Sequence, residues 1–232
     1  MHVAIIPARG GSKRLPRKNI KSFNGAPIIS YAIQTALKSG LYDRIIVSTD
    51  DNEIALLAQQ YGAETPFKRN HELSGDNIPT VPVIKDALLK SFKLHSLPEF
   101  VTAIYPCTPM LEPDDLITAA GLIKDNNINY IFPVCAFPSP PERALHLDKT
   151  MKIASVNPEF AWVRTQDLEC SFFDAGQFYC GKTETWLNET ELHNGSKALI
   201  FPFWKAVDID TPEDWKFAEL IYNVMSPKNT ND

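Results

Sequence analysis

Two groups of charged residues have the types and spacing to handle a phosphate-bearing substrate. The first is a loop after the apolar residues 3–6, which contains Gly10 and Gly11 and has no acid between residues 9 and 18. Its five cations are Arg9, Lys13, Arg14, Arg17 and Lys18. Glycines let backbone N–H groups come close to a ligand, and successive amides form an anion-binding concavity. We interpret the loop as a triphosphate cradle, because in the alternative, a solvated basic turn, the five cations would repel one another.

The second group is the carboxylate pair Asp208 and Asp210, in a run that predicts a strand over residues 206–210. Residues i and i+2 of a strand point to the same side, so the two carboxylates would repel each other unless a cation lay between them. Hard oxygen ligands suit Mg²⁺ that is shared with substrate phosphates. The other role open to Asp210, capping the next helix, is one that Thr211 can already fill.

Together the two groups indicate nucleotidyl transfer. The loop would neutralise a triphosphate, the acids would hold Mg²⁺ against its α-phosphate, and an acceptor hydroxyl would attack in line as pyrophosphate leaves. The loop matches neither G-x-x-x-x-G-K-[ST] nor G-x-G-x-x-G, which disfavours an ordinary ATPase or dehydrogenase. His71 and Glu72 lack the second histidine of a zinc-protease motif.

Composition favours a small anionic ligand over nucleic acid or a membrane. The chain has 232 residues, 44% of them hydrophobic, and a net charge of −5. Five of the 23 basic residues lie in the loop, so positive charge is concentrated there and the rest of the chain is acidic. Binding nucleic acid would need a broad basic face instead. The four cysteines form no C-x-x-C pair, which favours a reducing cytoplasm over a disulfide framework. We recognise no signal peptide and no apolar run of the ~20 residues that span a membrane.

The elements that must position these groups alternate between strand and helix. We expect strands over residues 3–6, 44–48, 64–68, 100–105, 130–136 and 206–210. We expect helices over residues 27–38 and 54–61, a third around residues 84–88, and two that begin at Pro113 and Pro212. In the last helix Phe217, Leu220, Ile221 and Val224 fall on one face, as a core-facing stripe would.

This alternation predicts one α/β domain over residues 1–232, with a doubly wound, mostly parallel sheet covered on both faces. Ligands of such sheets bind beyond the carboxyl ends of the strands. The basic loop, Asp50, the turn at residues 105–106 and the acidic pair should therefore meet at one edge. For Asp50 and Asp51, helix capping explains the residue types at least as well as ligand binding does.

The pattern fails after Phe137, where three prolines follow within four residues and cannot continue a ladder. We interpret residues 137–181, which are irregular and rich in aromatic residues, as an excursion from the sheet, an arm that packs on a second subunit. The tail after Pro227 is expected to be disordered.

Residues 5–19 resemble the signature of the CMP-sialate synthetase family, the cytidylyltransferases that activate nine-carbon α-keto acid sugars. The resemblance covers nearly the whole chain and includes residues 46–51, 69–76, 105–109 and 207–210. Residues 164–168 (R-T-Q-D-L) and 174–179 (D-A-G-Q-F-Y) resemble pseudaminic acid cytidylyltransferases in particular. The family implies a Rossmann-like nucleotidyltransferase fold and a homodimer in which the arm supplies the interface and lends sugar contacts.

Residue by residue, the resemblance implies a nucleotide site, a metal pair and a sugar site. The nucleotide would contact Ala8, Arg9, Gly10, Gly11, Ser12, Lys18, Asn19, Arg69 and Thr80. Lys18 would lie near the triphosphate and Asn19 near the cytidine, while Asp208 and Asp210 match the Mg²⁺-binding pair. With Arg9 and Lys18, these two acids are the candidate catalytic residues. The sugar would meet Tyr105, Arg164, Gln166 and Gln177.

Tyr105 departs from the family pattern, because sialic-acid synthetases typically have a glutamine at this position. The absence of this glutamine favours a differently decorated sugar. We expect transfer of CMP from CTP to the anomeric hydroxyl of pseudaminic acid. N-acetylneuraminate, legionaminate and Kdo are the alternative acceptors. A non-catalytic nucleotide-sensing module is the alternative of another class, although such a module would be free to lose the second carboxylate. No residue stands out as the base that deprotonates the sugar hydroxyl.

Overall fold

The computed structural model describes residues 1–125, 127–188 and 191–225, and its main sheet has seven strands. The strand order is β11-β6-β10-β5-β1-β4, and β9 pairs with β6. The strands are β1 (His2–Pro7), β4 (Arg44–Ser48), β5 (Phe100–Ile104), β6 (Tyr130–Ala136), β9 (Phe172–Asp174), β10 (Phe178–Lys182) and β11 (Lys197–Ile200). Only β9 and β10 run against the others, so the expected mostly parallel sheet is confirmed. The tail after Pro227 lies outside the described residues.

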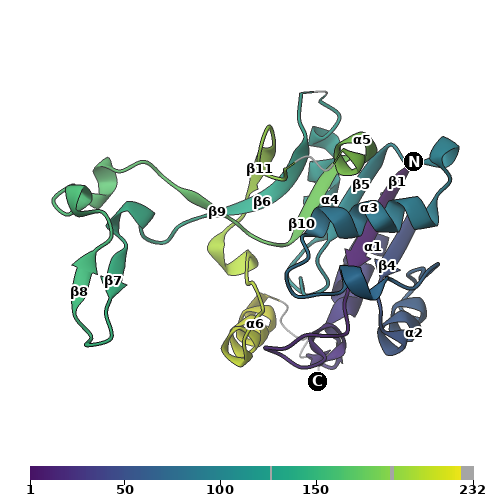
Figure 1. Cartoon of the computed structure of the whole chain (residues 1–232), viewed down its shortest axis with the longest axis horizontal. Coiled ribbons are helices and arrows are strands. Elements are labelled where there is room, and N and C mark those ends of the chain that lie inside the picture. The colour runs from purple at the N-terminus through teal and green to yellow at the C-terminus, as the bar shows by residue number, and fades with distance from the viewer. Residues whose placement is uncertain (126, 189–190, 226–232) are drawn as a thin grey trace, which may run out of the picture.

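Helices cover both faces of this sheet, as Figure 1 shows. They are α1 (Ile28–Ser39), α2 (Asn52–Gln60), α3 (Thr80–Ser91), α4 (Pro113–Leu122), α5 (Thr183–Leu187) and α6 (Pro212–Met225). Successive side chains of a strand point to opposite faces, and β1 follows this rule. Ala4 and Ile6 pack in the cluster that contains α1, α2 and α4, whereas Val3 and Ile5 pack in the cluster that contains α3 and α5. The doubly wound architecture is therefore confirmed.

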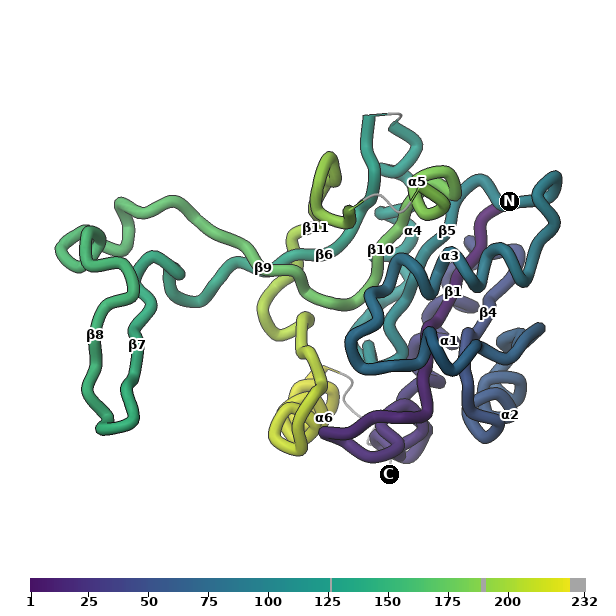
Figure 2. Tube along the Cα trace, viewed as in Figure 1, coloured from purple at the N-terminus to yellow at the C-terminus, as the bar shows by residue number. Residues whose placement is uncertain are grey.

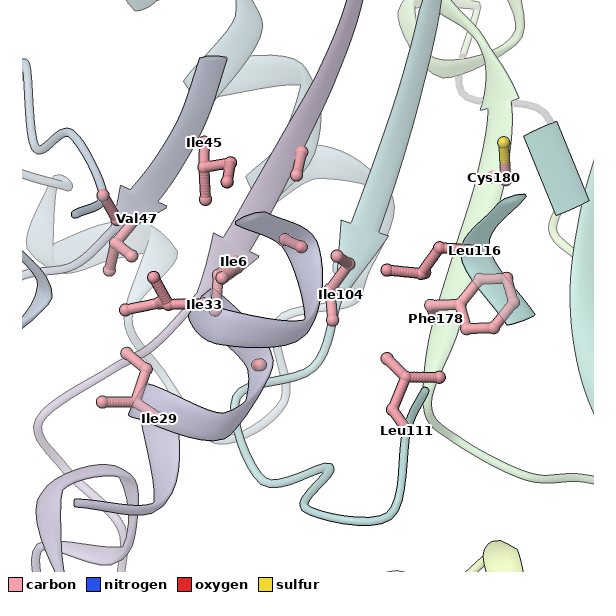
Figure 3. Close-up of a cluster of buried hydrophobic side chains, with 14 of the residues drawn as sticks. Ile6, Ile29, Ile33, Ile45, Val47, Ile104, Leu111, Leu116, Phe178 and Cys180 are labelled. Atoms are coloured by element: carbon pink, nitrogen blue, oxygen red, sulfur yellow. The ribbon is translucent and has the colours of Figure 1, made fainter. Parts of the chain in front are cut away.

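The larger of these clusters holds strands β1 and β5 in place. Ile6 of β1, Ile33 of α1 and Ile104 of β5 are fully buried side by side in Figure 3. Leu116 of α4 and Phe178 of β10 extend the same cluster across the sheet. Each such side chain contributes on the order of 1.5–3 kcal/mol by burial, so the ends of β1 and β5 are held on a rigid base.

Short elements complete the fold. Two small hairpins pair β2 (Ser22–Phe23) with β3 (Ala26–Pro27) and β7 (Leu145–Leu147) with β8 (Ile153–Ser155). The 3-10 turns are η1 (Lys18–Ile20), η2 (His71–Leu73), η3 (Leu94–Ser96), η4 (Pro141–Arg143), η5 (Pro158–Phe160), η6 (Thr165–Asp167) and η7 (Phe203–Lys205).

Two expected strands are wrong. Residues 64–68 make a single bridge, Ile46 to Glu64, because Pro66 lacks the N–H that a ladder needs. Residues 206–210 belong to no strand; β11 is the edge of the sheet instead. Side-chain packing holds this segment, since Val207 and Ile209 are 6% and 1% exposed in a cluster with Trp215. The intervening acids are thereby left on the other side, which keeps the expected alternation without a ladder.

The face assigned to the last helix is wrong for three of its four residues, while Ile221 is partly buried against the cluster that contains Trp215. In α6 the buried residues are Trp215 and Ala218, whereas Phe217, Leu220 and Val224 are 44%, 66% and 76% exposed. The helix carries two apolar stripes, and periodicity does not choose between them. Trp215 decides the orientation, because its ring packs edge-on against Phe23 with 5.5 Å between centroids.

An arm projects from the sheet and ends in the β7–β8 hairpin (Figures 1 and 2). The expected excursion over residues 137–181 ends too late, since β9 and β10 lie within it and belong to the sheet. β10 even separates β5 from β6 in the sheet order, and Phe178, Tyr179 and Cys180 are buried. Continuous burial on both faces gives this strand no polar alternation, which is why the pattern along residues 172–181 concealed it.

Candidate active site

A cavity of about 400 Å³ opens where β1 and β5 end. Pro7, the last residue of β1, and Tyr105, the first residue after β5, both line it. Its other walls come from the basic loop, from residues 69–83, from Gly176 and from residues 207–210. The expected meeting of the loop, the turn at residues 105–106 and the acidic pair is therefore confirmed, whereas Asp50 contacts the loop at Gly10 without lining the cavity.

Carboxylates of the protein neutralise the basic loop. Asp76 bridges Arg9 Nη1 and Lys13 Nζ, each at 2.5 Å. The same two cations lower the pKa of Asp76, so this carboxylate stays ionised. Arg17 turns away from the cavity and pairs with Asp51 and Glu53 of the α2 region.

We refer to the loop cations together with Asp76, Asp208 and Asp210 as the charged mouth of the cavity. The second acidic partner of the cations is Asp210. It receives Arg14 Nη2 at 2.6 Å and Lys18 Nζ at 3.1 Å, and Lys18 Nζ also donates to the carbonyl of Ile209 at 2.6 Å. All five cations thus have carboxylate partners, so self-repulsion does not by itself require an anionic ligand, and that step of the sequence argument is wrong. In the cavity, the loop cations therefore have two anionic partners, Asp76 and Asp210.

Gly10 serves the packing of the loop, whereas a Cβ on Gly11 would meet no atom within 4 Å. The Gly10 N–H donates to Asp50 Oδ1 at 3.0 Å, and a Cβ on Gly10 would lie 2.7 Å from Asp51 Oδ2. Ala8 is fully buried, and neither it nor Gly10 nor Gly11 lines the cavity. Asp51 caps α2 by accepting two backbone N–H groups, so capping explains that residue. Of the nucleotide residues expected in the loop, Arg9, Ser12, Lys18 and Asn19 line the cavity.

Asp208 differs from every other acid at the mouth. It lines the cavity and, among the described residues, it forms no salt bridge or hydrogen bond; the charges of Lys18 and Arg14 act on it only from a distance and lower its pKa less than the other influences raise it. Its side chain reaches solvent, yet the surrounding protein removes part of its hydration; this desolvation, and then the charge of Asp210, raise its pKa. An unpaired carboxylate beside a second one is a position that a cation would stabilise.

Mg²⁺ fits this donor set only as a shared ion. Across residues 1–125, 127–188 and 191–225, no three His, Cys, Asp or Glu side chains come close enough to hold a metal. Mg²⁺ commonly uses one or two carboxylates and takes its remaining ligands from water and substrate phosphates. Asp208 and Asp210 meet that requirement, provided that Asp210 yields one of its cation contacts.

The inner wall of the cavity carries a buried cation. Arg69 is 5% exposed, and its Nε donates to Ser48 Oγ at 3.0 Å while its Nη2 donates to the Ser48 carbonyl. Burial lowers the pKa of Arg69 to about 10, which still leaves it charged at neutral pH. Asn19 is equally enclosed: its Nδ2 donates to the carbonyl of Arg9 at 2.8 Å, and Cys107 Sγ lies 3.4 Å from its Oδ1.

Two hydroxyl-bearing residues, Thr80 and Tyr105, line another part of the cavity, which we call the hydroxyl wall. Thr80 Oγ1 lies 2.6 Å from Tyr105 Oη, and both residues line the cavity. The ring of Tyr105 packs edge-on against that of Tyr179 with 5.8 Å between centroids, and Tyr179 Oη donates to Asp174 Oδ2 at 2.6 Å. Neither Asp174 nor Tyr179 was among the site residues expected from the sequence. The D-A-G-Q-F-Y segment was the signal that could have identified them.

The remaining sugar candidates do not line the cavity. Gln177 is 1% exposed and its Nε2 donates to the carbonyl of Lys205 at 3.0 Å, so Gly176 is the cavity residue of this segment. Arg164 and Gln166 lie on the arm, where both are exposed and Arg164 pairs with Asp167. Within one copy of the chain, the fold does not bring these two residues to the site.

Comparison with known proteins gives one family. The model of the family described as Cytidylyltransferase matches residues 3–153. A pseudaminic acid cytidylyltransferase of Campylobacter jejuni is 37% identical over 96% of this chain and 97% of its own length. A CMP-N,N'-diacetyllegionaminic acid synthase of Legionella pneumophila is 31% identical over 94% of this chain and 95% of its own length.

Solved structures share the fold. The structure of CMP:2-keto-3-deoxy-manno-octonic acid synthetase complexed with CTP superposes with a TM-score of 0.69 at 17% identity, covering 97% of this chain and 99% of that chain. Among the helices that the structure describes, none has the length and apolar character needed to cross a membrane.

Proposed function

The chain belongs to the cytidylyltransferase family, and from that premise we propose that it transfers CMP from CTP to the anomeric hydroxyl of pseudaminic acid, releasing pyrophosphate. One observation carries the proposal: a single cavity joins four cations of the basic loop to the carboxylates Asp208 and Asp210. The choice of sugar is supported by the relative named pseudaminic acid cytidylyltransferase, which matches this chain over nearly its full length.

In this proposal the mouth binds the triphosphate by ion exchange. Lys13 and Arg14 expose 81% and 68% of their side chains, so they can swing from carboxylates to phosphates at little cost in burial. Arg9 and Lys18 are more enclosed and would hold the phosphates nearest the reacting atom. Charge on the leaving pyrophosphate would then be stabilised by cations that are already positioned.

Asp208 and Asp210 would hold Mg²⁺, which when bound polarises a phosphoryl oxygen and neutralises developing charge. Asp208 has the free carboxylate for this, while Lys18 stays within reach of both Asp210 and the phosphates. Arg69, Asn19 and Thr80 would contact the cytidine on the enclosed side of the cavity.

We also propose a homodimer in which the arm of one copy completes the sugar site of the other. The arm presents apolar side chains to solvent, such as Trp162, which is 96% exposed, and Ile153, which is 66% exposed. Arg164 and Gln166 would reach the sugar only from a second copy. Cys135 and Cys180 are buried as free thiols, which agrees with the reducing cytoplasm that we propose as the compartment.

Pyrophosphate release tests the proposal. The protein is incubated with CTP, Mg²⁺ and one sugar at a time from a panel of pseudaminate, legionaminate, N-acetylneuraminate and Kdo. We expect turnover with pseudaminate and much slower turnover with the others. Efficient use of another sugar without pseudaminate turnover would overturn the choice of acceptor, and no release with any sugar would overturn the activity itself.

A further inference from the structure

The acidic segment, residues 206–210, is held in place by side chains instead of a strand. Among the described residues, its middle three residues make no backbone–backbone hydrogen bond. Lys18 Nζ donates to the carbonyl of Ile209 at 2.6 Å. Gln177 Nε2 donates at 3.0 Å to the carbonyl of Lys205, the residue just before the segment. The first carboxylate of the segment lies between these two carbonyls, so its position depends on both donors.

Gln177 connects three of the pieces that form the cavity. Its side chain is 1% exposed, and its backbone carbonyl accepts the N–H of Tyr105, directly after β5, at 2.8 Å. It follows Gly176, which lines the cavity in the turn before β10. Its side-chain amide then reaches the acidic segment at Lys205. A change at this one buried residue therefore acts on the acidic segment from within the protein, without touching the charged mouth.

The residue that Gln177 holds is itself anchored. Lys205 is 6% exposed, and at the start of α4 its Nζ meets Glu112 Oε2 at 2.6 Å and Asp115 Oδ2 at 2.8 Å. A buried ammonium group with two carboxylate partners stays where it is, because leaving them would strand a charge. The hydrogen bond from Gln177 thus ends on a fixed point of the backbone, three residues before Asp208.

The amide of Gln177 makes this contact at a cost in stability. The carbonyl of Lys205 can only accept, so the amide must turn its NH₂ group there and its Oε1 away. Among the described residues, no donor reaches this buried Oε1. A buried acceptor without a partner destabilises the folded state, and an apolar side chain of similar length would fill the same space without that cost. Stability alone therefore does not explain a glutamine at this position.

We propose that Gln177 is a positioning residue that sets Asp208 in place for Mg²⁺ by holding the backbone at Lys205. The inference deepens the proposed function, since it rests on the acidic pair binding Mg²⁺. It gives Gln177 a different role from the sugar contact that the family resemblance implied. Loss of the amide should weaken the use of the metal and spare both the fold and the cations that meet the triphosphate.

Binding of CTP with and without metal is the first test. Dissociation constants are measured by calorimetry in MgCl₂ and in EDTA, with no sugar present, so that no turnover occurs. Gln177→Met removes the donor and keeps the length of the side chain. We expect this variant to bind CTP as the wild type does in EDTA and to lose about fivefold or more of the affinity that MgCl₂ adds. Its melting temperature without ligand should equal or exceed that of the wild type.

The matched control is Thr35→Val. Thr35 Oγ1 also donates from a buried side chain to a carbonyl, that of Leu111 at 3.0 Å, and Thr35 does not line the cavity. This variant should lower the melting temperature and keep the full gain in affinity from MgCl₂. The inference is overturned if Gln177→Met unfolds at a much lower temperature, which would make Gln177 a structural residue, or if it keeps the full gain. A wild-type protein that gains no affinity from MgCl₂ would overturn it as well.

Turnover distinguishes positioning of the metal pair from a contact with the sugar. In Gln177→Met, pyrophosphate release should be slow at limiting MgCl₂ and should recover as MgCl₂ is raised, with the KM for the sugar unchanged. A raised KM for the sugar at every MgCl₂ concentration would restore the sugar contact and overturn the inference. If the wild-type protein releases no pyrophosphate with any sugar, the proposed function falls, while CTP binding in MgCl₂ and EDTA still decides the role of Gln177.

Discussion

The charged mouth and the hydroxyl wall line one cavity, yet they are built in opposite ways. At the mouth, exposed cations pair with Asp76 and Asp210, and such pairs are each worth only about 0–1 kcal/mol in water. At the wall, Tyr179 is buried and Tyr105 is partly buried, so a broken hydrogen bond there leaves a polar group that water reaches poorly. The mouth is therefore suited to exchange partners with a substrate, and the wall is suited to remain as it is.

Asp208 is the exception at the mouth, and it gives the largest expected effect. Because its carboxylate is unpaired among the described residues and is proposed to hold Mg²⁺, Asp208→Asn should lower kcat about a hundredfold or more. The measurement is pyrophosphate release at saturating CTP and sugar. Asp114→Asn, an exposed acid on α4 outside the cavity, is the matched control and should keep full activity. Retained activity in Asp208→Asn would remove the metal pair from the mechanism.

A substitution in the hydroxyl wall should lower the free energy of unfolding by an amount that does not depend on salt. In Tyr105→Phe the hydroxyl of Thr80 loses its partner, which should cost about 0.5–1.5 kcal/mol of unfolding free energy. Urea unfolding at low and at high ionic strength measures this cost. The loss should be the same at both, because no net charge is involved. A loss that disappears in high salt would mean that the wall is held electrostatically, like the mouth.

The sequence predicted the mouth better than the wall, for a physical reason. Lys18 and Asp210 are 192 positions apart, yet each follows a buried apolar run, and loops of an α/β fold meet at the carboxyl edge of the sheet; residues 206–210 reach that edge by packing on Trp215 and not as a strand. Their meeting could therefore be inferred without coordinates. Their pairing could not, because it depends on Asp76 and Asp210 reaching into the loop, and side-chain reach leaves no periodic pattern. That is why the self-repulsion argument failed.

The wall escaped prediction because its residues look like core. Tyr179 lies in β10, a strand buried on both faces, and in the sequence it is one more aromatic residue in an irregular segment. Only the pairing of β10 with β5 brings it beside Tyr105. The unpaired segment of residues 206–210 teaches the converse: an apolar alternation can be satisfied by Trp215 on a helix as well as by a neighbouring strand.

Freeing two cations at the mouth should strengthen nucleotide binding modestly. In Asp76→Asn, Arg9 and Lys13 lose the carboxylate that competes with phosphate, so the affinity for CTP should rise about threefold to tenfold. Calorimetry over a series of salt concentrations is the measurement. The gain should shrink as salt screens the mouth. Weaker binding in this variant would show that Asp76 helps to hold the nucleotide instead of standing in for it.

The smallest expected effect is a change in melting temperature, which should have opposite signs in Asp208→Asn and Asp210→Asn. Desolvation and the charge of Asp210 raise the pKa of Asp208, so the folded protein binds this proton more tightly than the unfolded chain does. Ionised Asp208 therefore lowers stability at neutral pH, and Asp208→Asn should raise the melting temperature slightly. The gain should vanish as pH falls through the raised pKa, where the wild-type carboxyl is also neutral.

Asp210→Asn should instead lower the melting temperature at neutral pH, because Arg14 and Lys18 lose their ionised partner. Thermal unfolding of both variants between pH 4 and pH 8 makes the comparison, and Mg²⁺ added at neutral pH should stabilise the wild-type protein more than Asp208→Asn. If both substitutions lower stability equally and Mg²⁺ affects them alike, Asp208 is a paired structural acid like its neighbour. Every acid of the charged mouth would then have a cation partner, and the unpaired carboxylate on which metal binding depends would be missing.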